Sequence, residues 1–547
     1  MSPTVPGLSN EQRATLDAIF EPMRRSDAPG LVVGVARAGR PLYRQAFGLA
    51  SVAQGVANTV ATRMRIGSTT KHFTCVAALM LAEQGLLDLD AGIRRWLPDV
   101  AVPSGEPTLR QLMTHTSGLR CYIDLSFISH GMAVRARGTG RRTLARQGTA
   151  NYPPGERMIY CNSGYLLLSQ VIEQVSGQPL RTFLAERILQ PMGMHDTELV
   201  PDDFETVPRL AELHVRRADG GYRRGVFPQQ EFLGDGAMVS SMDDMLRWLA
   251  HLREPSQLLT PAGWAQLQAR PRLNNGLLTR YGLGLQGTPY RGLDTVHHGG
   301  AVIGGACQML TLPSHALDIV ILSNGAATSP SRLAPRIIDA LLGEALAHPA
   351  TMARSQAHAA WLGATFQAPS GTVVSFKDAD GQLGLCLAGN EPVPLRQQGA
   401  ALRLEFEDAA VGPFDISFEA DGSDSASPPA CLLLSECGNA ERAEHVSPSA
   451  PDLPALAAEI GGRYRCADLQ VNATLTLEAG ELLLRITGEA GFNTLRLTPV
   501  NAELLLCQPA DPLVPLRGTL AVKREAGQVK GLTFNSTRTR GLAFERS

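Results

Sequence analysis

The hydrophobic pattern of this 547-residue chain changes character near residue 350. Before that point, helical and strand-like patterns are mixed, as in an α/β or α+β domain. After it, short runs of alternating hydrophobic and polar residues dominate, and Gly, Asp and Pro separate them. A chain of this length is too long for a single core, so about three domains are expected. The pattern therefore predicts one mixed domain followed by β domains.

A weak internal repeat divides the second part of the chain. WLGATF…TVVSFKDADGQLGLCLAG resembles IGGRYR…ATLTLEAGELLLRITG about 100 residues later, so that Gly363 corresponds to Gly461 and Phe366 to Tyr464. Two similar antiparallel β-barrels are the simplest interpretation. The Ser/Pro-rich stretches DGSDSASPPA and HVSPSAPDLPA predict a loop and an interdomain linker. We therefore expect domains at residues 1–350, 351–450 and 451–547.

Composition argues against several classes of function. A net charge of −2 disfavours a surface for nucleic acid or anionic membranes. The first twenty residues show no signal-peptide pattern, and no stretch reaches the ~18 apolar residues that a membrane-spanning helix needs. The nine cysteines include no C-x-x-C pair. They predict reduced thiols in a cytoplasmic protein, rather than disulfides or a zinc site.

Lysine is rare in this chain. Only four of its 50 lysine and arginine residues are lysine, and Lys71 is the only one among the first 376 residues. Arginine cannot lose its proton in a protein, whereas a partly buried lysine can. Lys71 therefore has the character of a base. Ser68 stands three residues before it, and this S-x-x-K spacing pairs a nucleophile with a base.

The residues after Ser68 predict a buried helix. Phe73, Val76, Ala77, Met80 and Leu81 fall on one helical stripe, and Gly85 is the expected C-cap. A spacing of three on a helix puts Ser68 and Lys71 side by side, and a helix N-terminus stabilises a developing alkoxide. The alternative is a helix cap followed by a surface lysine.

Two further motifs could complete a catalytic site. Tyr160 and Asn162 form a Y-x-N ahead of a second predicted helix. A tyrosine beside a lysine ammonium can ionise and act as a general base or proton shuttle. Asn162 could hold an acyl amide and orient Lys71. The alternative is a core tyrosine before a helix cap.

The glycine-rich run HHGGAVIGG supplies the third motif, an H-x-G on a predicted strand. Strand alternation points His297 to the opposite face, so His298 is the candidate. Gly300 would let a substrate backbone lie close to the strand. The N–H of Ala301, with that of Ser68, could form an oxyanion hole. Taken alone, this motif also fits a glycine-rich turn with a structural histidine.

Together these motifs resemble a known family. RIGSTTKHFTCVAALMLAEQGLLDLD, TLRQLMTHTSGL, YPPGERMIYCNSGYLLLSQVIEQVSG, PMGM and HGG are similar to the penicillin-binding and class C β-lactamase group, in the same order. The resemblance implies an α+β catalytic domain, with an antiparallel sheet and helices. His298 stands where β-lactamases usually carry a lysine, which argues against recognition of β-lactams.

A closer resemblance covers the whole chain. A catalytic domain with two C-terminal β-barrels, and the stretches FLGDGAMVSSMDDMLRW and KGLTFNSTRTRGLAFER, are similar to the bacterial D-aminopeptidases of this group. In that family a loop of the last barrel carries an aspartate that holds the α-amino group of the substrate. The matching stretch LLLCQPADPLVPLRGTLAV has Asp511 as its only acid. A plain Asp-Pro turn is the alternative. His115 and Asp235 are assigned turn and scaffold roles.

The sequence therefore predicts a cytoplasmic serine hydrolase that removes an N-terminal residue from small peptides, amides or esters by way of an acyl-enzyme. D configuration and a homodimer are implied by the resemblance alone. No metal or cofactor is needed. An esterase, or a D,D-carboxypeptidase or β-lactamase-like hydrolase with the same nucleophile, remains an alternative. So does a penicillin-binding-type sensor in which the barrels dock partners.

Overall fold

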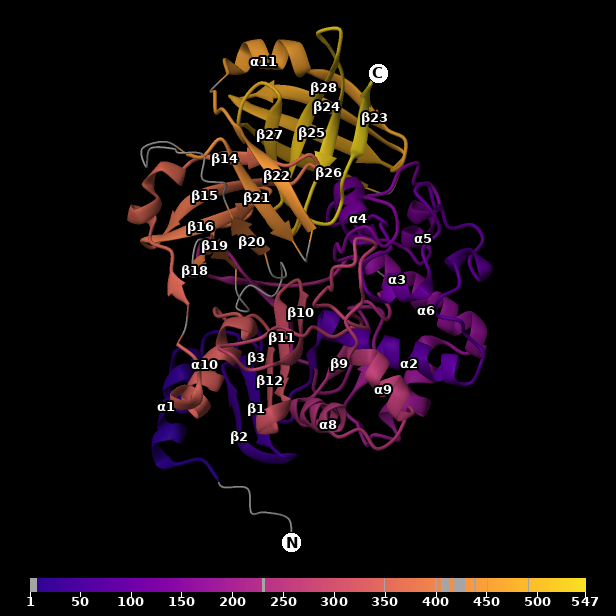
Figure 1. Ribbon diagram of the computed structural model, residues 1–547, viewed down its shortest axis with the longest axis vertical. Helices are drawn as coiled ribbons and strands as arrows, with labels where there is room; N and C mark the ends of the chain where they lie inside the picture. Colours follow the sequence, from indigo (N-terminus) through magenta and orange to yellow (C-terminus); the bar gives the residue numbers. More distant parts are fainter. Residues whose placement is uncertain are drawn as a thin grey trace.

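The computed structural model of the chain describes residues 7–228, 232–348, 350–398, 401–404, 414–417, 428–436, 439–449, 451–489 and 491–547. Along the chain follow an N-terminal domain of mixed α and β structure (7–348), a ten-stranded middle sheet, and a closed barrel. Figure 1 shows the middle sheet and the barrel on the same side of the N-terminal domain. The predicted order of an α+β domain and two antiparallel β domains is confirmed, while the boundaries at 350 and 450 remain predictions.

A five-stranded antiparallel sheet forms the centre of the N-terminal domain, in the order β10-β11-β12-β1-β2. Helices cover both faces: α1 and α10 pack on one side and α8 on the other. Because of this cover, β12 is buried at every position; its sequence is mainly apolar, and its buried Asp318 pairs with Arg253 of α8. The bounds are β1 (Leu31–Arg37), β2 (Arg40–Phe47), β10 (Val296–Val302), β11 (Gly305–Leu312), β12 (Leu317–Ser323), α1 (Asn10–Phe20), α8 (Met242–Arg253) and α10 (Pro330–Leu342).

The remaining helices form a layer beside this sheet. Helix α2 is buried along most of its length and packs against α6 and α9, as its apolar sequence requires. Gly85, the predicted C-cap after α2, and Gly177 at the end of α6 both have positive φ. The bounds are α2 (Lys71–Glu83), α3 (Leu109–Met113), α4 (Tyr122–His130), α5 (Thr139–Leu144), α6 (Asn162–Ser176), α7 (Leu180–Leu184) and α9 (Pro261–Gln268). Small sheets add β3 (Leu49–Ser51) with β4 (Val56–Ala57), β5 (Met64–Arg65) with β9 (Met238–Ser240) and β6 (Glu198–Leu199), and β7 (His214–Arg216) with β8 (Tyr222–Arg224).

The middle sheet has the order β13-β18-β19-β20-β21-β22-β14-β15-β16-β17 and does not close within the described residues. One of the two predicted barrels is therefore an open, antiparallel sheet here. Its strands are β13 (Thr351–Met352), β14 (Thr365–Gln367), β15 (Val373–Ala379), β16 (Gln382–Leu387), β17 (Val393–Pro394), β18 (Arg396–Gln398), β19 (Ala401–Arg403), β20 (Phe414–Ser417), β21 (Cys431–Glu436) and β22 (Asn439–Val446). Most of the predicted loop DGSDSASPPA lies outside the described residues.

The last eight strands close into the second predicted barrel, in sequence order from β23 to β30. Alternate residues point inward along each strand, as in β24, whose burial alternates from Val471 to Leu475. The strands are β23 (Gly462–Cys466), β24 (Val471–Glu478), β25 (Glu481–Gly488), β26 (Gly491–Pro499), β27 (Leu504–Pro509), β28 (Gly518–Glu525), β29 (Gln528–Asn535) and β30 (Leu542–Arg546), and α11 (Leu453–Ile460) precedes them.

The internal repeat corresponds to a shared succession of elements. In each copy a helical segment precedes a short strand with a buried aromatic residue, Phe366 in β14 and Tyr464 in β23. A two-residue hairpin follows in each, at Asp380–Gly381 and at Ala479–Gly480. All four hairpin residues have positive φ, the geometry that such tight hairpins require.

The barrel and the N-terminal domain share one hydrophobic core. Buried residues of α4 and α6 belong to the same cluster as buried residues of the barrel strands. Helix α4 packs against β25 and β26 (Figure 1). A Cβ on Gly491 would lie 2.9 Å from the carbonyl oxygen of His130, so strand and helix touch backbone to backbone. The barrel is thus fixed on the N-terminal domain through α4.

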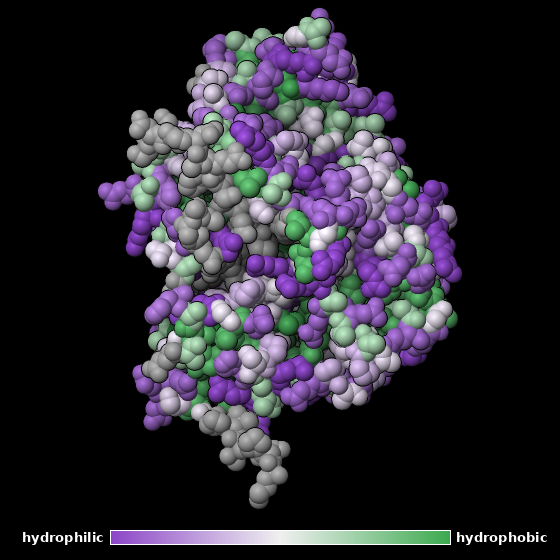
Figure 2. All heavy atoms as spheres, in the orientation of Figure 1, coloured by the Kyte–Doolittle hydropathy of each residue, from purple (hydrophilic) through white to green (hydrophobic). Residues whose placement is uncertain are grey.

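The outer surface is mainly hydrophilic on the face that Figure 2 shows, where hydrophobic residues occur in small patches. Among the described residues, the helices are all too short or too polar to cross a bilayer.

Candidate active site

The S-x-x-K segment turns sharply where it meets β10. Gly67–Thr70 form a 3-10 turn, and α2 continues from Lys71. Gly67 has a φ of 52°, and a Cβ on it would lie 2.8 Å from the nitrogen of Ala301, so only glycine fits. Between Thr62 and Leu81, every residue except Ser68 is buried. The fold therefore exposes one hydroxyl from an otherwise inaccessible segment.

Lys71 holds three oxygen atoms around its buried ammonium. Its Nζ is 3.0 Å from the Oγ of Ser68, 2.8 Å from the Oδ1 of Asn162 and 2.5 Å from the carbonyl oxygen of Asp235. These contacts fix the Nζ beside the hydroxyl that the spacing predicted. Asn162 also donates through its Nδ2 to the Sγ of Cys121, at 3.5 Å, which settles the orientation of its amide.

Burial brings the pKa of Lys71 into the range of a base that works at neutral pH. It lowers the pKa of Lys71 to about 7, against the opposing influence of Asp235 and with a further lowering from Arg538. The neutral amine can then accept the proton of Ser68 along the 3.0 Å hydrogen bond. Arginine could not do this, which accounts for the lysine at this position.

Tyr160 lies over the ammonium of Lys71. The Nζ is 4.9 Å from the centre of the Tyr160 ring, and the Tyr160 hydroxyl is buried near the Ser68 side chain. Burial raises the pKa of Tyr160 well above its usual range, against the opposing influences of Ser68 and Arg538. Tyr160 is therefore protonated at neutral pH. Of the two roles that the sequence allowed, general base and proton shuttle, the protonated form suits the shuttle.

His298 and Tyr281 are hydrogen-bonded to each other, and both rings lie near Tyr160. The Nε2 of His298 is 2.9 Å from the Tyr281 hydroxyl, and its Nδ1 is 2.5 Å from the carbonyl oxygen of Gly299. A carbonyl only accepts, so we assign the proton to Nδ1, and Nε2 accepts from Tyr281. Burial, with Lys71 nearby, lowers the pKa of His298 to about 3. His298 is therefore neutral and lies 6.3 Å from Tyr160 between ring centres.

Gly300 lies against the chain's own backbone. A Cβ on Gly300 would lie 1.8 Å from the carbonyl oxygen of Ile66 and 3.2 Å from the nitrogen of Ser68. This close approach alone requires glycine here, and the predicted contact of Gly300 with a substrate backbone stays a prediction. Ala301 is exposed, and its nitrogen lies beside Gly67. The N–H groups of Ser68 and Ala301 thus come from two backbone segments in contact.

His115 and Asp235, which the sequence assigned to turn and scaffold roles, contact the side chains of the predicted site. His115 has a φ of 59°, accepts a hydrogen bond from the nitrogen of Cys161 at 3.1 Å, and lies 4.1 Å from the Tyr160 ring between centres. The carboxylate of Asp235 accepts from the Tyr122 hydroxyl at 2.7 Å, while its carbonyl holds Lys71. His115 therefore places Tyr160, and Asp235 places Lys71.

Asp511 bonds within its own connection. It lies in an exposed turn after β27, where its carboxylate accepts a hydrogen bond from the nitrogen of Leu513 at 2.9 Å. Arg517 of the same connection donates to Gly389 and Glu391 beside the strands of the middle sheet. The connection thus lies against the middle sheet, and the Asp-Pro pair forms the turn that was the alternative. The contact of Asp511 with a substrate stays a prediction.

A different connection of the barrel reaches the N-terminal domain, namely residues 536–541, called here the β29–β30 turn. Arg538 forms an ion pair with Asp124 of α4, whose side chain is 1% exposed, and Ser536 donates to the same carboxylate at 2.9 Å. Asn151 donates to the carbonyl oxygen of Arg538 at 3.1 Å and accepts from the nitrogen of Arg540 at 2.8 Å. Both sides of the turn are thus attached to the N-terminal domain.

Buried Arg120 adds further bonds at the base of this turn. It donates to the carbonyl oxygens of Arg540 at 2.9 Å and Gly541 at 2.8 Å, and pairs with Asp468 of the barrel at 2.7 Å. A buried guanidinium needs several acceptors, and most of these come from the barrel. Removal of the barrel would leave Arg120 largely without partners.

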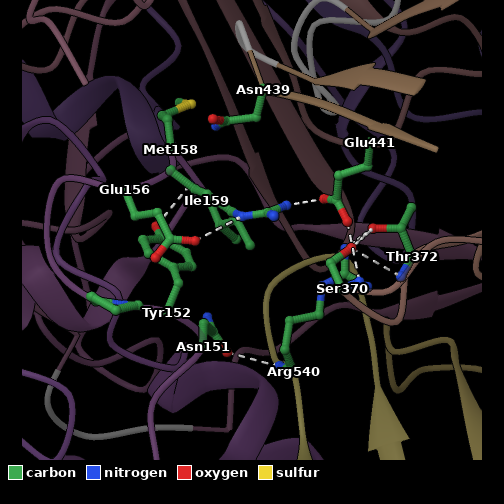
Figure 3. Close-up of a pocket in the computed structure, with 12 residues that line it drawn as sticks. Asn151, Tyr152, Glu156, Met158, Ile159, Ser370, Thr372, Asn439, Glu441 and Arg540 are labelled. Atoms are coloured by element: carbon green, nitrogen blue, oxygen red, sulfur yellow. Dashed lines mark hydrogen bonds and ion pairs between the residues drawn. The ribbon is translucent and has the colours of Figure 1, made fainter. Parts of the chain in front are cut away.

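Figure 3 shows a cavity of about 200 Å³ where the N-terminal domain, the middle sheet and the barrel meet. Its charged side chains bond to one another or to nearby hydroxyls: Arg157 pairs with Glu441, and Arg540 donates to Thr372 at 3.0 Å. The cavity is lined by Asn151, Tyr152, Pro153, Glu156, Arg157, Met158, Ile159, Ser370, Thr372, Asn439, Glu441 and Arg540. Residues 151–159 immediately precede Tyr160. The middle sheet and the barrel therefore contact the segment that leads to Tyr160.

Within the described residues, no cluster of three or more His, Cys, Asp or Glu side chains is arranged to hold a metal ion. All eight cysteines described are unpaired and buried.

Comparison with known proteins places these features in a family. The Beta-lactamase family model matches residues 16–344. A D-aminopeptidase of Cereibacter sphaeroides (strain ATCC 17023) is 27% identical over 537 residues, covering 95% of this chain and 96% of its own. A D-aminopeptidase of Brucella melitensis biotype 2 is 27% identical over 563 residues, covering 98% and 100%.

Two solved structures share the fold. The octameric penicillin-binding protein homologue from Pyrococcus abyssi has a TM-score of 0.54 at 19% identity and covers 97% of this chain and 100% of its own. The D-amino acid amidase from Ochrobactrum anthropi SV3 has a TM-score of 0.52 at 23% identity and covers 61% and 99%. The amidase match covers about the length of the N-terminal domain, whereas the Pyrococcus match spans nearly the whole chain.

Proposed function

The chain belongs to the Beta-lactamase family, and we propose that it acts there as a serine hydrolase that releases N-terminal D-amino acids from small peptides, amides or esters. The observation that carries the proposal is the accessible Ser68 hydroxyl, held 3.0 Å from a buried lysine whose pKa is about 7. Relatives named D-aminopeptidase match nearly the whole chain, including both C-terminal parts, and support the peptidase activity and the D configuration.

In the first half of the proposed reaction, the Oγ of Ser68 bonds to the substrate carbonyl carbon and its proton passes to neutral Lys71. The N–H groups of Ser68 and Ala301 would stabilise the oxyanion. Tyr160, protonated and buried beside Lys71, would give its proton to the leaving nitrogen as the C–N bond breaks. It would regain a proton from Lys71. Neutral His298 supports Tyr281 without placing a charge near the oxyanion.

In the second half, water attacks the ester carbon of the acyl-enzyme and gives one proton to Lys71. As the ester C–O bond breaks, Lys71 returns this proton to the Oγ of Ser68, which leaves as a hydroxyl. Asn162 holds Lys71 throughout and would face the acyl group. All the groups that transfer a proton in this scheme lie within the cluster around Lys71.

An esterase or amidase with the same nucleophile is the second candidate. The bond of the Asp511 carboxylate to the nitrogen of Leu513 in its own turn favours it, because Asp511 was the sequence-based reason for recognition of a free amino group.

The stereochemical proposal can be tested with four substrates: D- and L-alanine p-nitroanilide, each with a free and with an acetylated amino group. We expect the free D substrate to be cleaved at least about 10²-fold faster than the free L substrate, since a small misplacement of the reacting carbon has an effect of that size. Acetylation should slow the D substrate. Equal rates for free and acetylated substrates would favour the esterase or amidase alternative.

We expect kcat/KM to rise with pH around an apparent pKa near 7, because only neutral Lys71 accepts the Ser68 proton. The rate should fall about tenfold per pH unit on the acid side and level off at about one to two units above neutrality. Burial lowers the pKa values of His115, His297 and His298 far below this range. p-Nitrophenyl acetate is the substrate of choice, since it has no amino group. A flat profile would contradict the base role of Lys71.

A homodimer and a cytoplasmic location also remain predictions. Light scattering of the purified protein would test the first, and cell fractionation the second.

A further inference from the structure

The β29–β30 turn carries a cation, Arg538, that is attached to the helix next to the Lys71 cluster. From Lys71, hydrogen bonds lead to Asn162 at 2.8 Å and on to Cys121 at 3.5 Å. Cys121 immediately precedes α4, and Asp124 in the first turn of that helix forms the ion pair with Arg538. Arg538 is therefore connected to Lys71 through a short series of buried groups.

Only some of the hydrogen-bond donors of Arg538 have a partner among the described residues. One Nη donates to Asp124, and the Nε and the other Nη make no hydrogen bond with the described residues. The Arg538 side chain is 27% exposed, whereas that of Asp124 is 1% exposed and also accepts from Ser536. A guanidinium has five N–H donors, so Arg538 retains several for a ligand. Both Asp124 oxygens already have partners, which leaves the cation as the accessible member of the pair.

The backbone of the turn is too firmly held for Arg538 to be a mobile surface residue. Asn151 bonds to the Arg538 carbonyl, and the Ser536 side chain accepts from the nitrogens of Arg538 at 3.2 Å and Thr539 at 3.0 Å. Its charge also reaches the catalytic groups. Although burial sets the direction of both shifts, Arg538 acts to lower the pKa values of Lys71 and Tyr160.

We propose that Arg538 binds the C-terminal carboxylate of a short peptide while Ser68 attacks the peptide bond. This inference rests on the proposed function, because a peptide with a free amino group at one end carries its one backbone anion at the other. A guanidinium fork offers a carboxylate two parallel hydrogen bonds, which a carboxamide cannot match. The enzyme should therefore prefer short peptides with a free carboxylate over the corresponding amides.

The test compares D-alanyl-D-alanine with D-alanyl-D-alaninamide, which differ only in the terminal carboxylate. We expect wild type to cleave the dipeptide with a higher kcat/KM than its amide. Arg538→Gln should reduce that preference by about 10- to 150-fold, the range for a lost charge-assisted hydrogen bond, mainly through KM. Cleavage of the amide should change little.

Three variants control for structural damage. Arg517→Gln removes a cation from the neighbouring connection of the same barrel, which pairs with Glu391, and should leave the preference unchanged. Asp124→Asn removes the partner but keeps the cation, so the preference should persist. Asp511→Asn, in the connection after β27, should leave the preference unchanged, because both substrates carry the same free amino group. The thermal unfolding midpoint of each variant shows whether the barrel remains in place.

The outcomes separate the inference from the proposed function. If wild type cleaves neither compound, the proposed function fails and this inference fails with it. If wild type cleaves both equally well, or if Arg538→Gln slows both by the same factor, Arg538 serves only to attach the barrel. The proposed function would then stand. If Arg517→Gln matches Arg538→Gln, the effect is one of overall charge and the inference is also overturned.

Discussion

Replacing Ser68 by alanine is expected to lower kcat by at least about 10⁴-fold, the scale of losing a nucleophile together with its activated proton. Ser68 provides the one side-chain hydroxyl that accepts a hydrogen bond from Lys71 in the described structure. It is also the one accessible residue in a long buried segment. Because the change removes a single, partly exposed oxygen, the thermal unfolding midpoint should move by no more than a few degrees.

Mass spectrometry identifies the nucleophile directly. Incubation of wild type with a slowly deacylating ester should add the acyl mass to the peptide that contains Ser68, and the Ser68→Ala protein should remain unmodified. The described cysteines are all buried, and burial raises the pKa of several of them, among them Cys75 to about 12. They are therefore poor competitors. An adduct on a cysteine would refute Ser68 as the nucleophile.

Replacing Lys71 by arginine is expected to lower kcat at least about 10²-fold, the usual size of lost general-base catalysis. Arginine retains the positive charge but cannot take the proton of Ser68. A stopped-flow measurement of the acylation burst should show that the first step, attack by Ser68, is the one that slows. Activity within a few-fold of wild type would mean that Lys71 acts only through its charge.

Two controls make the Lys71 result interpretable. Lys377→Arg changes an exposed lysine of β15 in the same way and should leave kcat unchanged. Arginine is also larger than the lysine it replaces, in a site enclosed by Tyr160 and Tyr165. Lys71→Ala avoids this crowding, and added methylamine should restore part of its activity if a missing base is the defect. Failure of the amine to restore any activity to a folded Lys71→Ala protein would count against the base role.

The cluster around the nucleophile could be predicted because local geometry dictates it. The spacing of three residues on a helix places Lys71 beside Ser68, and the rarity of lysine drew attention to it. The contact of Asn162 with Lys71 was proposed from the chemistry of an amide beside an ammonium, but nothing in the spacing of two distant helices sets that contact. Tyr281 was not predicted, because a buried tyrosine ahead of a strand has no pattern that distinguishes it from a core residue.

The barrel's contribution could not be predicted from the sequence. In an up-and-down antiparallel barrel, the connection after β27 and the one after β29 leave from the same end. The way the barrel packs decides which of them is attached to the N-terminal domain, and that packing depends on α4 meeting β25 and β26. The sequence singled out Asp511 in the first connection, and its contact with a substrate stays a prediction, whereas the attachment of the second connection had no signal in the sequence. The pair of Arg538 with Asp124 joins residues 414 positions apart, beyond any local pattern.

That separation has a consequence for the synthesis of the protein. A ribosome adds residues at about 5–20 per second, so Arg538 follows Ser68 by roughly 20 to 100 s. For most of this interval the nascent chain carries its complete S-x-x-K and Y-x-N motifs. The barrel residues that pair with Asp124 and Arg120 have not yet been synthesised. Chains interrupted or cut between the middle sheet and residue 536 would keep every residue that identifies the family. They would lack the cation of the β29–β30 turn, and an antibody or a sequence search directed at the motifs would count them as intact enzyme.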